Sequence, residues 1–409
     1  MTKETKKRIL FVYPEGFPNL RISKMIAMLE SEDLEIYYLS EGNLKSRNFK
    51  NKVVFNERNI VWYEGLAAKL VRRSKYVFCK NKVKLVNKTS KDFVKILKQI
   101  QPDVIHWGGL AKSLSASRVA SSLNMHFILD LHENYPYNYW STARDLDSES
   151  NLYSLSDWLL YEKSAISAAD AILVTCDEMR SRLIGMHGLS SGKIFVVHNT
   201  ENPEEWGGIN FDLINKARLE SSTFDLIYGG SCSIHRGLDV AIAGISLLIA
   251  EYPDIRLHIV GEGPGIDYWK SLARKLNLSE IVTFYGQLPY PRLRQMMLES
   301  NVGIIPHHQY GQTDNTNPHK LYQHFGAGLP SLVSSCHSLQ NAIAETGTGM
   351  AFMAGDSRDF ADTVIILRDN FIPKTDTVQL GRSALKNGKY SWAYSRLQLM
   401  NAYAYKNTH

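Results

Sequence analysis

Short apolar runs alternate with longer segments in which apolar residues recur at helical spacing, and this alternation continues along most of the 409-residue chain. Strands and helices that alternate in this way are typical of parallel, doubly wound α/β sheets. In the first half the pattern predicts helices at Leu20–Leu29 and Thr89–Gln101, and no regular element over residues 43–86. The predicted strands of this half are Arg8–Tyr13, Ile36–Leu39, Val104–Trp107, Phe127–Asp130, Ala171–Val174 and Ile194–Val197.

The alternation restarts after a polar, glycine-containing stretch near residue 200, which predicts a second Rossmann-like domain. Its strands are expected at Leu226–Tyr228, Leu257–Val260, Val282–Tyr285, Val302–Ile305 and Leu332–Val333. Its helices are expected at about 238–251, 266–276, 291–299, 317–327 and 357–369, with a helical tail from Trp392 to Tyr405.

A chain of this length is too long for one ordinary core, so two domains are expected. We predict an amino-terminal Rossmann-like domain over residues 1–202, a linker over 203–222 and a second Rossmann-like domain over 223–385. Residues 386–409 would form a helical tail that packs back on the first domain.

Composition excludes several classes of protein. Apolar residues make up 44% and charged residues 22%, as in globular proteins, and no apolar run approaches the length of a membrane span. The first residues lack the apolar core of a signal peptide. The cysteines stand singly, which argues against structural zinc or a disulfide framework and fits a reducing cytoplasm; they are Cys79, Cys176, Cys232 and Cys336.

The formal charge of +6 is concentrated in residues 45–98, where sixteen Lys and Arg face only Glu57, Glu64 and Asp92. Such a run can be a solvated face, a patch that binds an anionic membrane surface, or a docking site for a charged acceptor. Nucleic acid is disfavoured as a partner because the stretch carries no recognised binding motif.

One segment of the second half combines helix-end signals with candidate chemistry. Asn317 is a suitable N-cap, Pro318 suits the first helical position, and Gly328 can adopt the left-handed conformation that ends a helix. A short helix from about Pro318 to Ala327 is therefore predicted.

Lys320 lies in the first turn of this predicted helix, where a cation opposes the helix dipole. An anion bound between the lysine and the free N–H groups would explain it. Lys320, Gln323 and His324 share one helix face, while Leu321 lies on another. The alternative is a capped surface helix with a solvated lysine.

Two glycine-rich turns follow predicted strands of the second domain. Gly229–Gly237 contains Gly230 and Arg236, and a guanidinium can hold phosphate in bidentate fashion. Val260–Gly265 contains Gly261 and Gly263, but Ile266 breaks the Gly-x-Gly-x-x-Gly fingerprint, so a simple strand-to-helix turn is the alternative there.

Taken in order, these motifs resemble the donor half of a GT-B glycosyltransferase of the retaining family 4 (glycosyl transferases group 1). They are Gly-Gly…Arg-Gly-Leu-Asp, Ile-Val-Gly-Glu-Gly-Pro, Val-Thr-Phe-Tyr-Gly-Gln-Leu, Gly-Ile-Ile-Pro-His and Asn-Pro-His-Lys-Leu-Tyr-Gln-His-Phe-Gly-Ala-Gly-Leu-Pro. The first half shares Asp130–Glu133, Ala169–Thr175 and Val196–Asn199 with the family. The resemblance implies two Rossmann-like domains that face a central cleft.

The resemblance also implies roles for particular residues. Arg236 and Lys320 match the basic clamp on the donor diphosphate, Gln323 matches the group that binds the ribose, and Asn315 and His132 match catalytic positions. His132 would lie at the acceptor–donor junction, at the end of a parallel strand where doubly wound folds bind ligands. The implied donor site comprises Gly230, Arg236, Gly261, Gly263, Asn317, Lys320, Leu321 and Gln323.

This sequence departs from the family pattern at three positions. Gly230 replaces the usual arginine after the first strand of the second domain. Asn315 and Gln323 replace the two acids of the Glu-x7-Glu motif, in a variant with Gln in the Lys-Leu-Phe/Tyr-Glu context. An amide can still bond a hydroxyl, but the loss of charge near the transferring sugar puts the donor sugar in question.

The function implied is a retaining, metal-independent glycosyltransferase. It would transfer a hexose from a UDP- or GDP-sugar to a glycan or lipid-linked acceptor in envelope or surface polysaccharide biosynthesis, with no tightly bound cofactor. We expect it in the cytoplasm, peripheral on the inner face of the membrane. The alternatives are a sugar-nucleotide epimerase of the same fold and a catalytically weak nucleotide-sugar-binding protein.

Overall fold

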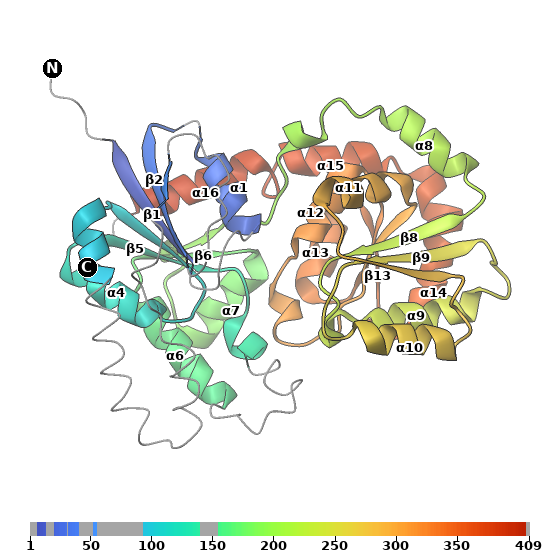
Figure 1. Ribbon diagram of the computed structural model, residues 1–409, viewed down its shortest axis with the longest axis horizontal. Coiled ribbons are helices and arrows are strands. Elements are labelled where there is room, and N and C mark those ends of the chain that lie inside the picture. The colour runs from blue at the N-terminus through green and yellow to red at the C-terminus, as the bar shows by residue number, and fades with distance from the viewer. Residues whose placement is uncertain are drawn as a thin grey trace. The chain divides into compact units, whose positions relative to one another are not determined.

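The computed structural model describes residues 6–13, 20–30, 32–40, 52–54, 93–139 and 154–405. The chain divides into two compact units (Figure 1). Unit 1 comprises Met1–Val197 and Arg396–His409, and unit 2 comprises His198–Ser395.

Unit 1 is built on a parallel sheet with the strand order β3-β2-β1-β4-β5-β6-β7. Its central strands are buried on both faces, which is why they appear in the sequence as continuous apolar runs. The strands are β1 (Lys7–Tyr13), β2 (Leu34–Ser40), β3 (Lys52–Val54), β4 (Val104–Gly108), β5 (His126–Leu131), β6 (Ala171–Val174) and β7 (Ile194–Val196).

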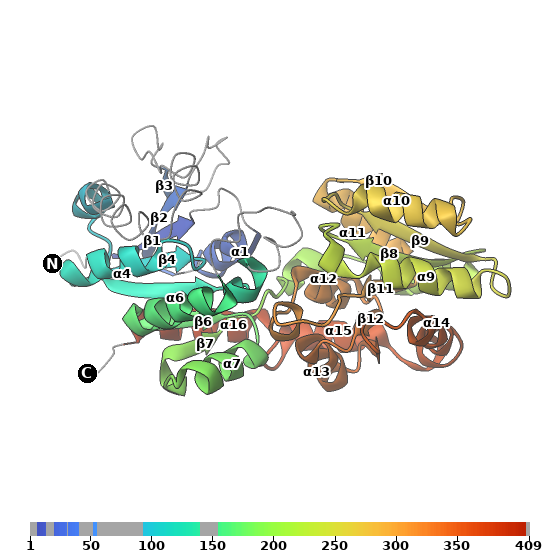
Figure 2. The same ribbon diagram turned by 90° about the horizontal axis from the view of Figure 1, so that it is seen from below.

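Helices flank both faces of this sheet (Figure 2). They are α1 (Leu20–Met28), α4 (Ser113–Ser122), α6 (Leu155–Ala168), α7 (Asp177–His187) and the end of α16 (Trp392–Ala404), and residues 93–100 and 135–139 are also helical. A single core cluster joins the sheet to the helices on one face through residues such as Trp107, Phe127 and Ile166.

The last turns of α16 belong to unit 1 although the chain reaches them from unit 2. Lys7 Nζ donates to the carbonyl of Tyr403 at 2.9 Å, and the Tyr403 hydroxyl lies 2.9 Å from His106 Nδ1. Arg396 donates to the Met28 carbonyl at 3.1 Å. These contacts attach α16 to β1, β4 and α1.

Unit 2 repeats the architecture with a parallel sheet ordered β10-β9-β8-β11-β12-β13. Successive right-handed crossovers place α9, α10 and α14 on one face and α11, α12 and α13 on the other (Figure 1). The strands are β8 (Phe224–Gly229), β9 (Ile255–Val260), β10 (Val282–Gly286), β11 (Val302–Ile305), β12 (Ser331–Ser334) and β13 (Gly349–Phe352). The helices are α8 (Phe211–Glu220), α9 (Leu238–Leu248), α10 (Ile266–Lys275), α11 (Tyr290–Glu299), α12 (His319–Ala327), α13 (His337–Thr346), α14 (Ser357–Ile366) and α15 (Thr377–Lys386).

The predicted linker over 203–222 is wrong. This segment forms a 3-10 turn (Pro203–Trp206) and α8, and both belong to unit 2. Trp206 and Phe211 are buried in a cluster with Met297, so isolated apolar residues in a polar stretch anchor it. The chain instead passes between the units at residues 197/198 and 395/396.

Arg218 of α8 holds together the ends of two other helices. Its guanidinium donates to the carbonyls of Met297 and Leu298 at the end of α11, and to those of Ala327 and Gly328 at the end of α12. Burial lowers its pKa to about 10. Helix carboxyl ends carry partial negative charge, so four carbonyls serve as its acceptors.

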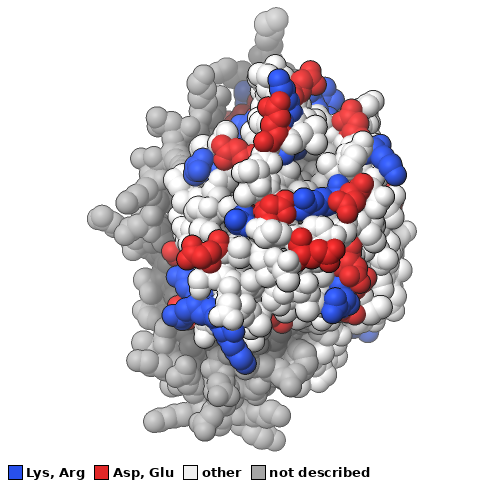
Figure 3. All heavy atoms as spheres, turned by 90° about the vertical axis from the view of Figure 1, so that its right-hand side faces the viewer, with Lys and Arg blue, Asp and Glu red and all other residues white. Residues whose placement is uncertain are grey.

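Most of the basic stretch over residues 45–98 lies outside the described residues. On the face of unit 2 in Figure 3, basic and acidic side chains are intermixed. Within the described ranges, no helix combines the length and apolar character that a membrane crossing requires.

Candidate functional site

The ends of β8 and β9 meet through glycines that no other residue could replace without a clash. Gly230 and Gly261 have φ values of +140° and +139°. A Cβ on Gly261 would lie 1.8 Å from the Gly230 carbonyl oxygen, and one on Gly263 would lie 2.8 Å from the Cys232 backbone. The two turns therefore run backbone against backbone, and a Cβ on Gly230 would lie 3.1 Å from Lys320 Nζ.

Arg236 closes the short 3-10 turn Ile234–Arg236 that follows. Gly237 has a φ of +67°, and a Cβ there would lie 1.8 Å from the Pro306 carbonyl, so this turn packs directly on the loop after β11. Arg236 Nη1 lies 3.3 Å from His307 Nε2, and the buried Nε has no hydrogen-bond partner.

Lys320 lies in the first turn of α12 and is only 7% exposed, so the alternative of a solvated lysine does not hold. Its Nζ lies 3.9 Å from the centroid of the Tyr228 ring. Burial, and after it the charge of Arg236, hold the pKa of Lys320 well below its ordinary value. In the described part of the chain, neither cation has a carboxylate within ion-pairing distance.

The start of α12 differs by one residue from the prediction. The N-cap is Pro318, whose ψ of 154° is extended, and it supplies no side-chain cap to the first N–H groups. Asn317 is not a cap: its carbonyl accepts from Asn199 Nδ2 at 2.8 Å, while its own buried Oδ1 lacks a partner. Gly328 ends the helix in the left-handed conformation, as predicted.

The remaining predicted residues of α12 are buried. Gln323 is 6% exposed and lies one turn beyond Lys320. His324 shares this face but packs in the interior, with Nδ1 3.0 Å from Ser331 Oγ and the ring against Gly303. Leu321 is fully buried in an apolar cluster, so its side chain is part of the core. Contact with a ligand would therefore involve Lys320 and Gln323.

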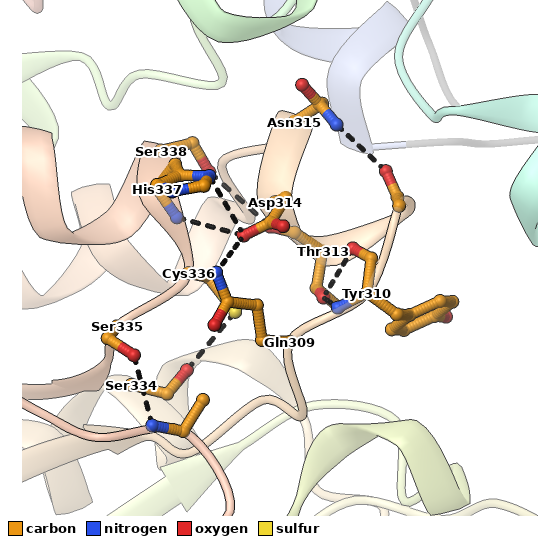
Figure 4. Close-up of polar contacts among 12 residues, drawn as sticks. Gln309, Tyr310, Thr313, Asp314, Asn315, Ser334, Ser335, Cys336, His337 and Ser338 are labelled. Atoms are coloured by element: carbon orange, nitrogen blue, oxygen red, sulfur yellow. Dashed lines mark hydrogen bonds and ion pairs between the residues drawn. The ribbon is translucent and has the colours of Figure 1, made fainter.

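Asn315 lies in a braced turn before α12 (Figure 4). Its Nδ2 donates to the Gly311 carbonyl at 3.0 Å, and the side chain points away from the contacts of its neighbour Asp314. Asp314 Oδ1 accepts from Gln309 Nε2 at 3.0 Å and from the His337 backbone N–H at 3.1 Å. The turn is thereby fixed between β11 and α13.

Three histidines around the two cations were not singled out from the sequence. Burial lowers the pKa of His235 to about 3, and burial together with the charge of Arg236 holds the pKa of His307 well below its ordinary value. His308 Nε2 lies 3.0 Å from Asp239 Oδ1, and that hydrogen bond raises the pKa of His308. The sequence signal that could have indicated them is the pair His307 and His308, which follow the strand ending at Ile305 by one residue.

In unit 1, His132 follows the end of β5 and is partly buried between two tyrosines. Its Nε2 lies 2.9 Å from the Tyr135 hydroxyl and 3.4 Å from the Tyr13 hydroxyl. Burial lowers the pKa of His132 to about 4, so the ring is neutral at pH 7. A neutral imidazole can donate one hydrogen bond to a hydroxyl and accept one from a hydroxyl.

A fully buried polar chain lies two residues before His132. Asp130 accepts three hydrogen bonds from the Arg21 guanidinium at 2.8–3.1 Å, and its other neighbour is His106 Nε2 at 3.6 Å. Burial opposes ionisation of Asp130, but the Arg21 charge and the hydrogen bonds hold its pKa well below the ordinary value. His106 in turn contacts Tyr403 of α16.

Over the described ranges, no three His, Cys, Asp or Glu side chains converge in a way that could hold an ion.

Two Rossmann-like units, each built on a parallel sheet, are the architecture of the GT-B class of fold. Residues 211–379 match the family model for glycosyl transferases group 1, and residues 42–205 match that for Glycosyltransferase Family 4. The chain therefore belongs to this family of glycosyltransferases, as the sequence motifs predicted.

Similar proteins share the architecture at low sequence identity. The glycogen synthase of Mycobacterium tuberculosis is 22% identical over 281 residues, which are 66% of this chain and 61% of that protein. The chain thus spans less than two thirds of this relative. A sucrose-phosphate synthase structure from Thermosynechococcus elongatus has a TM-score of 0.74 at 14% identity and covers 98% of both chains. The Anabaena HepE structure in complex with UDP and glucose has a TM-score of 0.71 at 14% identity, over 97% of this chain and 99% of that one.

Proposed function

We propose that this protein transfers a sugar from a UDP- or GDP-sugar to a hydroxyl of a glycan or lipid-linked acceptor, with retention of configuration and without a metal ion. The observation that carries the proposal is the pair Arg236 and Lys320 beside the uncapped start of α12. Two cations that lack carboxylate partners in the described chain, at a helix start that no side chain caps, suit a diphosphate. The complex of HepE with UDP and glucose supports a nucleotide-sugar donor.

In this proposal the clamp lowers the barrier by stabilising charge on the leaving diphosphate. Lys320 is buried and Arg236 is partly buried before the reaction, and charges shielded from water in this way act more strongly than in solution. They would do the work that a divalent ion does in other transferases. The acceptor hydroxyl would attack from the face that the diphosphate leaves.

The other candidate residues receive distinct roles. Gln323, one turn after Lys320, would bond a ribose hydroxyl of the donor. Asn315, whose Nδ2 donates to the Gly311 carbonyl, would contact the transferring sugar. His132, neutral at pH 7, would orient the acceptor hydroxyl.

The basic stretch over residues 45–98 suits attachment to an anionic membrane surface. Seven Lys and Arg lie within residues 69–84 with no acid among them. Each basic residue near an anionic leaflet contributes about 1 kcal/mol of attraction. We propose that this stretch brings the protein to the inner face of the membrane. Cosedimentation with anionic but not zwitterionic vesicles, lost on changing Arg72, Arg73 and Lys75 to Glu, would test it.

The transferase proposal is tested by a donor panel. The protein is incubated with UDP-, GDP-, ADP-, dTDP- and CMP-sugars, and melting is followed for each. A matching donor at about 100 times its Kd should add roughly 2.7 kcal/mol to the free energy of unfolding. Glycan product is then sought by mass spectrometry with and without EDTA, and its anomeric configuration by NMR. No shift with any nucleotide sugar would overturn the proposal, and a shift without transfer would indicate a binding protein.

A further inference from the structure

The buried imidazole of His307 is a hydrogen-bond partner of the Arg236 guanidinium. Arg236 Nη1 and His307 Nε2 are 3.3 Å apart. An arginine can only donate, so Nε2 must be the acceptor and the proton of the neutral ring must lie on Nδ1. This tautomer follows from the contact itself.

His307 is held in turn by a loop that cannot move independently of the glycine turn. Pro306, the preceding residue, packs its carbonyl against Gly237, and the His308 N–H donates to the His235 carbonyl at 3.1 Å. The side chain of His307 is only 1% exposed. The imidazole is therefore a fixed acceptor that is carried by the loop after β11, and not by the turn that carries Arg236.

Arg236 has little else to fix its orientation. It is partly buried, its Nε lacks a partner, and in the described chain it has no carboxylate at ion-pairing distance. A long side chain that must present two parallel N–H groups to a phosphate loses affinity if it is free to rotate. A neutral acceptor can orient the guanidinium and leave its positive charge available to the anion. An aspartate in the same place would neutralise that charge.

We propose that His307 is a positioning residue for donor binding, which fixes the Arg236 guanidinium against the diphosphate by accepting a hydrogen bond from its Nη1–H. The inference rests on the proposed donor site and adds a residue to it. It predicts that the effect of His307 on anion affinity is transmitted through Arg236.

The test is a double-mutant cycle read by calorimetric titration with UDP, GDP and inorganic pyrophosphate. His307→Met keeps approximate volume and removes the acceptor, whereas His307→Gln places an amide oxygen near the position of Nε2. We expect His307→Met to weaken binding about tenfold, Arg236→Ala about tenfold to a hundredfold, and the double variant no more than Arg236→Ala alone. His307→Gln should restore most of the affinity.

His258→Ala is the matched control, because it removes a histidine–carboxylate contact (to Asp225, 2.9 Å) elsewhere in unit 2. It should leave all three affinities unchanged. Additive losses of affinity for His307→Met and Arg236→Ala would overturn the inference while leaving the donor site in place. Equal losses of affinity for His307→Met and His307→Gln would do the same. Failure of the unaltered protein to bind any of the three probes would overturn both.

Discussion

Lys320 Nζ lies 3.9 Å from the centroid of the Tyr228 ring, and that aromatic face is its nearest favourable contact. A ring gives an ammonium roughly 0.5–2 kcal/mol, less than the cost of burying a charge. The unliganded protein therefore carries a desolvated lysine that is stabilised only when an anion arrives. The pKa of Lys320 is lowered by burial and by the charge of Arg236, because the contact with Tyr228 does not offset the cost of burying the ammonium.

Lys320→Met should raise the stability of the unliganded protein and abolish stabilisation by nucleoside diphosphate. The folded state holds the Lys320 pKa below that of the unfolded chain. As pH falls from 10.5 towards the folded-state pKa, only the unfolded state takes up this proton, and the resulting loss of stability persists at lower pH. The gain should be about 1–3 kcal/mol in urea denaturation at pH 7 and should vanish above pH 10.5. A variant less stable than the original protein at pH 7 would show that the buried ammonium is already compensated.

Arg218→Met should destabilise unit 2 by about 3 kcal/mol, because it leaves three partly buried helix-end carbonyls without their donor, while the Gly328 carbonyl keeps the Thr377 hydroxyl. Arg368→Met is a suitable control, since Arg368 forms a partly exposed ion pair with Asp254 and should contribute less than 1 kcal/mol. Urea titrations of both variants measure the difference. Equal effects would mean that water replaces the guanidinium at these helix ends.

The stability of unit 1 should decrease on acidification in part through His132. Its pKa is about 4 in the folded state, against 6.5 for an unperturbed imidazole. As pH falls from 6.5 towards 4, only the unfolded state takes up this proton, so the free energy of unfolding falls by at most about 1.4 kcal/mol per pH unit. His132→Gln should flatten this slope in melting curves between pH 7 and 4. An unaltered slope would mean that the ring is solvated.

Asp130→Asn and Tyr403→Phe probe the two ends of one buried chain and should differ in cost. The first leaves the Arg21 guanidinium buried without its counter-charge, which costs about 3–5 kcal/mol. The second removes one neutral hydrogen bond to His106 and should cost about 1 kcal/mol. Guanidinium denaturation monitored in unit 1 distinguishes them. Similar losses would indicate that the C-terminal helix, and not the ion pair, limits stability.

Gln323→Ala should raise the donor KM with little change in kcat, whereas Gln323→Glu should keep most of the activity. The reason is that either an amide or a carboxylate oxygen can accept a ribose hydroxyl, while a methyl group cannot. Asn315→Ala should instead change preference among sugars on one nucleotide. Initial rates across the donor panel test both, and an unchanged sugar preference for Asn315→Ala would contradict its proposed contact.

The sequence predicted the parallel sheets well because their strands are buried on both faces and leave continuous apolar runs, as at Ile172 and Ile304. It predicted the end of α12 because Gly328 and Pro330 are strong local signals. It missed β13 and α8, whose assignment depends on packing: β13 is a half-exposed edge strand, and α8 is fixed by Phe211 and Arg218. Local residue preferences do not encode such contacts.

For the site, sequence identified Arg236 and Lys320 but misjudged their surroundings. A lysine in the first turn of a helix is usually solvated, and only the tertiary fold places Tyr228 and the Gly230 turn over it. His307 ends the Gly-Ile-Ile-Pro-His motif but received no role, because the sequence does not show that it contacts Arg236. His307 becomes relevant only because the fold brings it within 3.3 Å of Arg236, which lies seventy-one residues earlier in the sequence.

The return of α16 to unit 1 has a consequence for synthesis on the ribosome. Unit 2 is continuous and is complete once residue 395 has emerged, whereas unit 1 lacks the partner of His106 until Tyr403 follows. The first half of the nascent chain must wait, with its Arg21–Asp130 pair uncovered on the side of α16, while two hundred further residues are translated. The order of translation is thus opposite to the order in which the two cores can be closed.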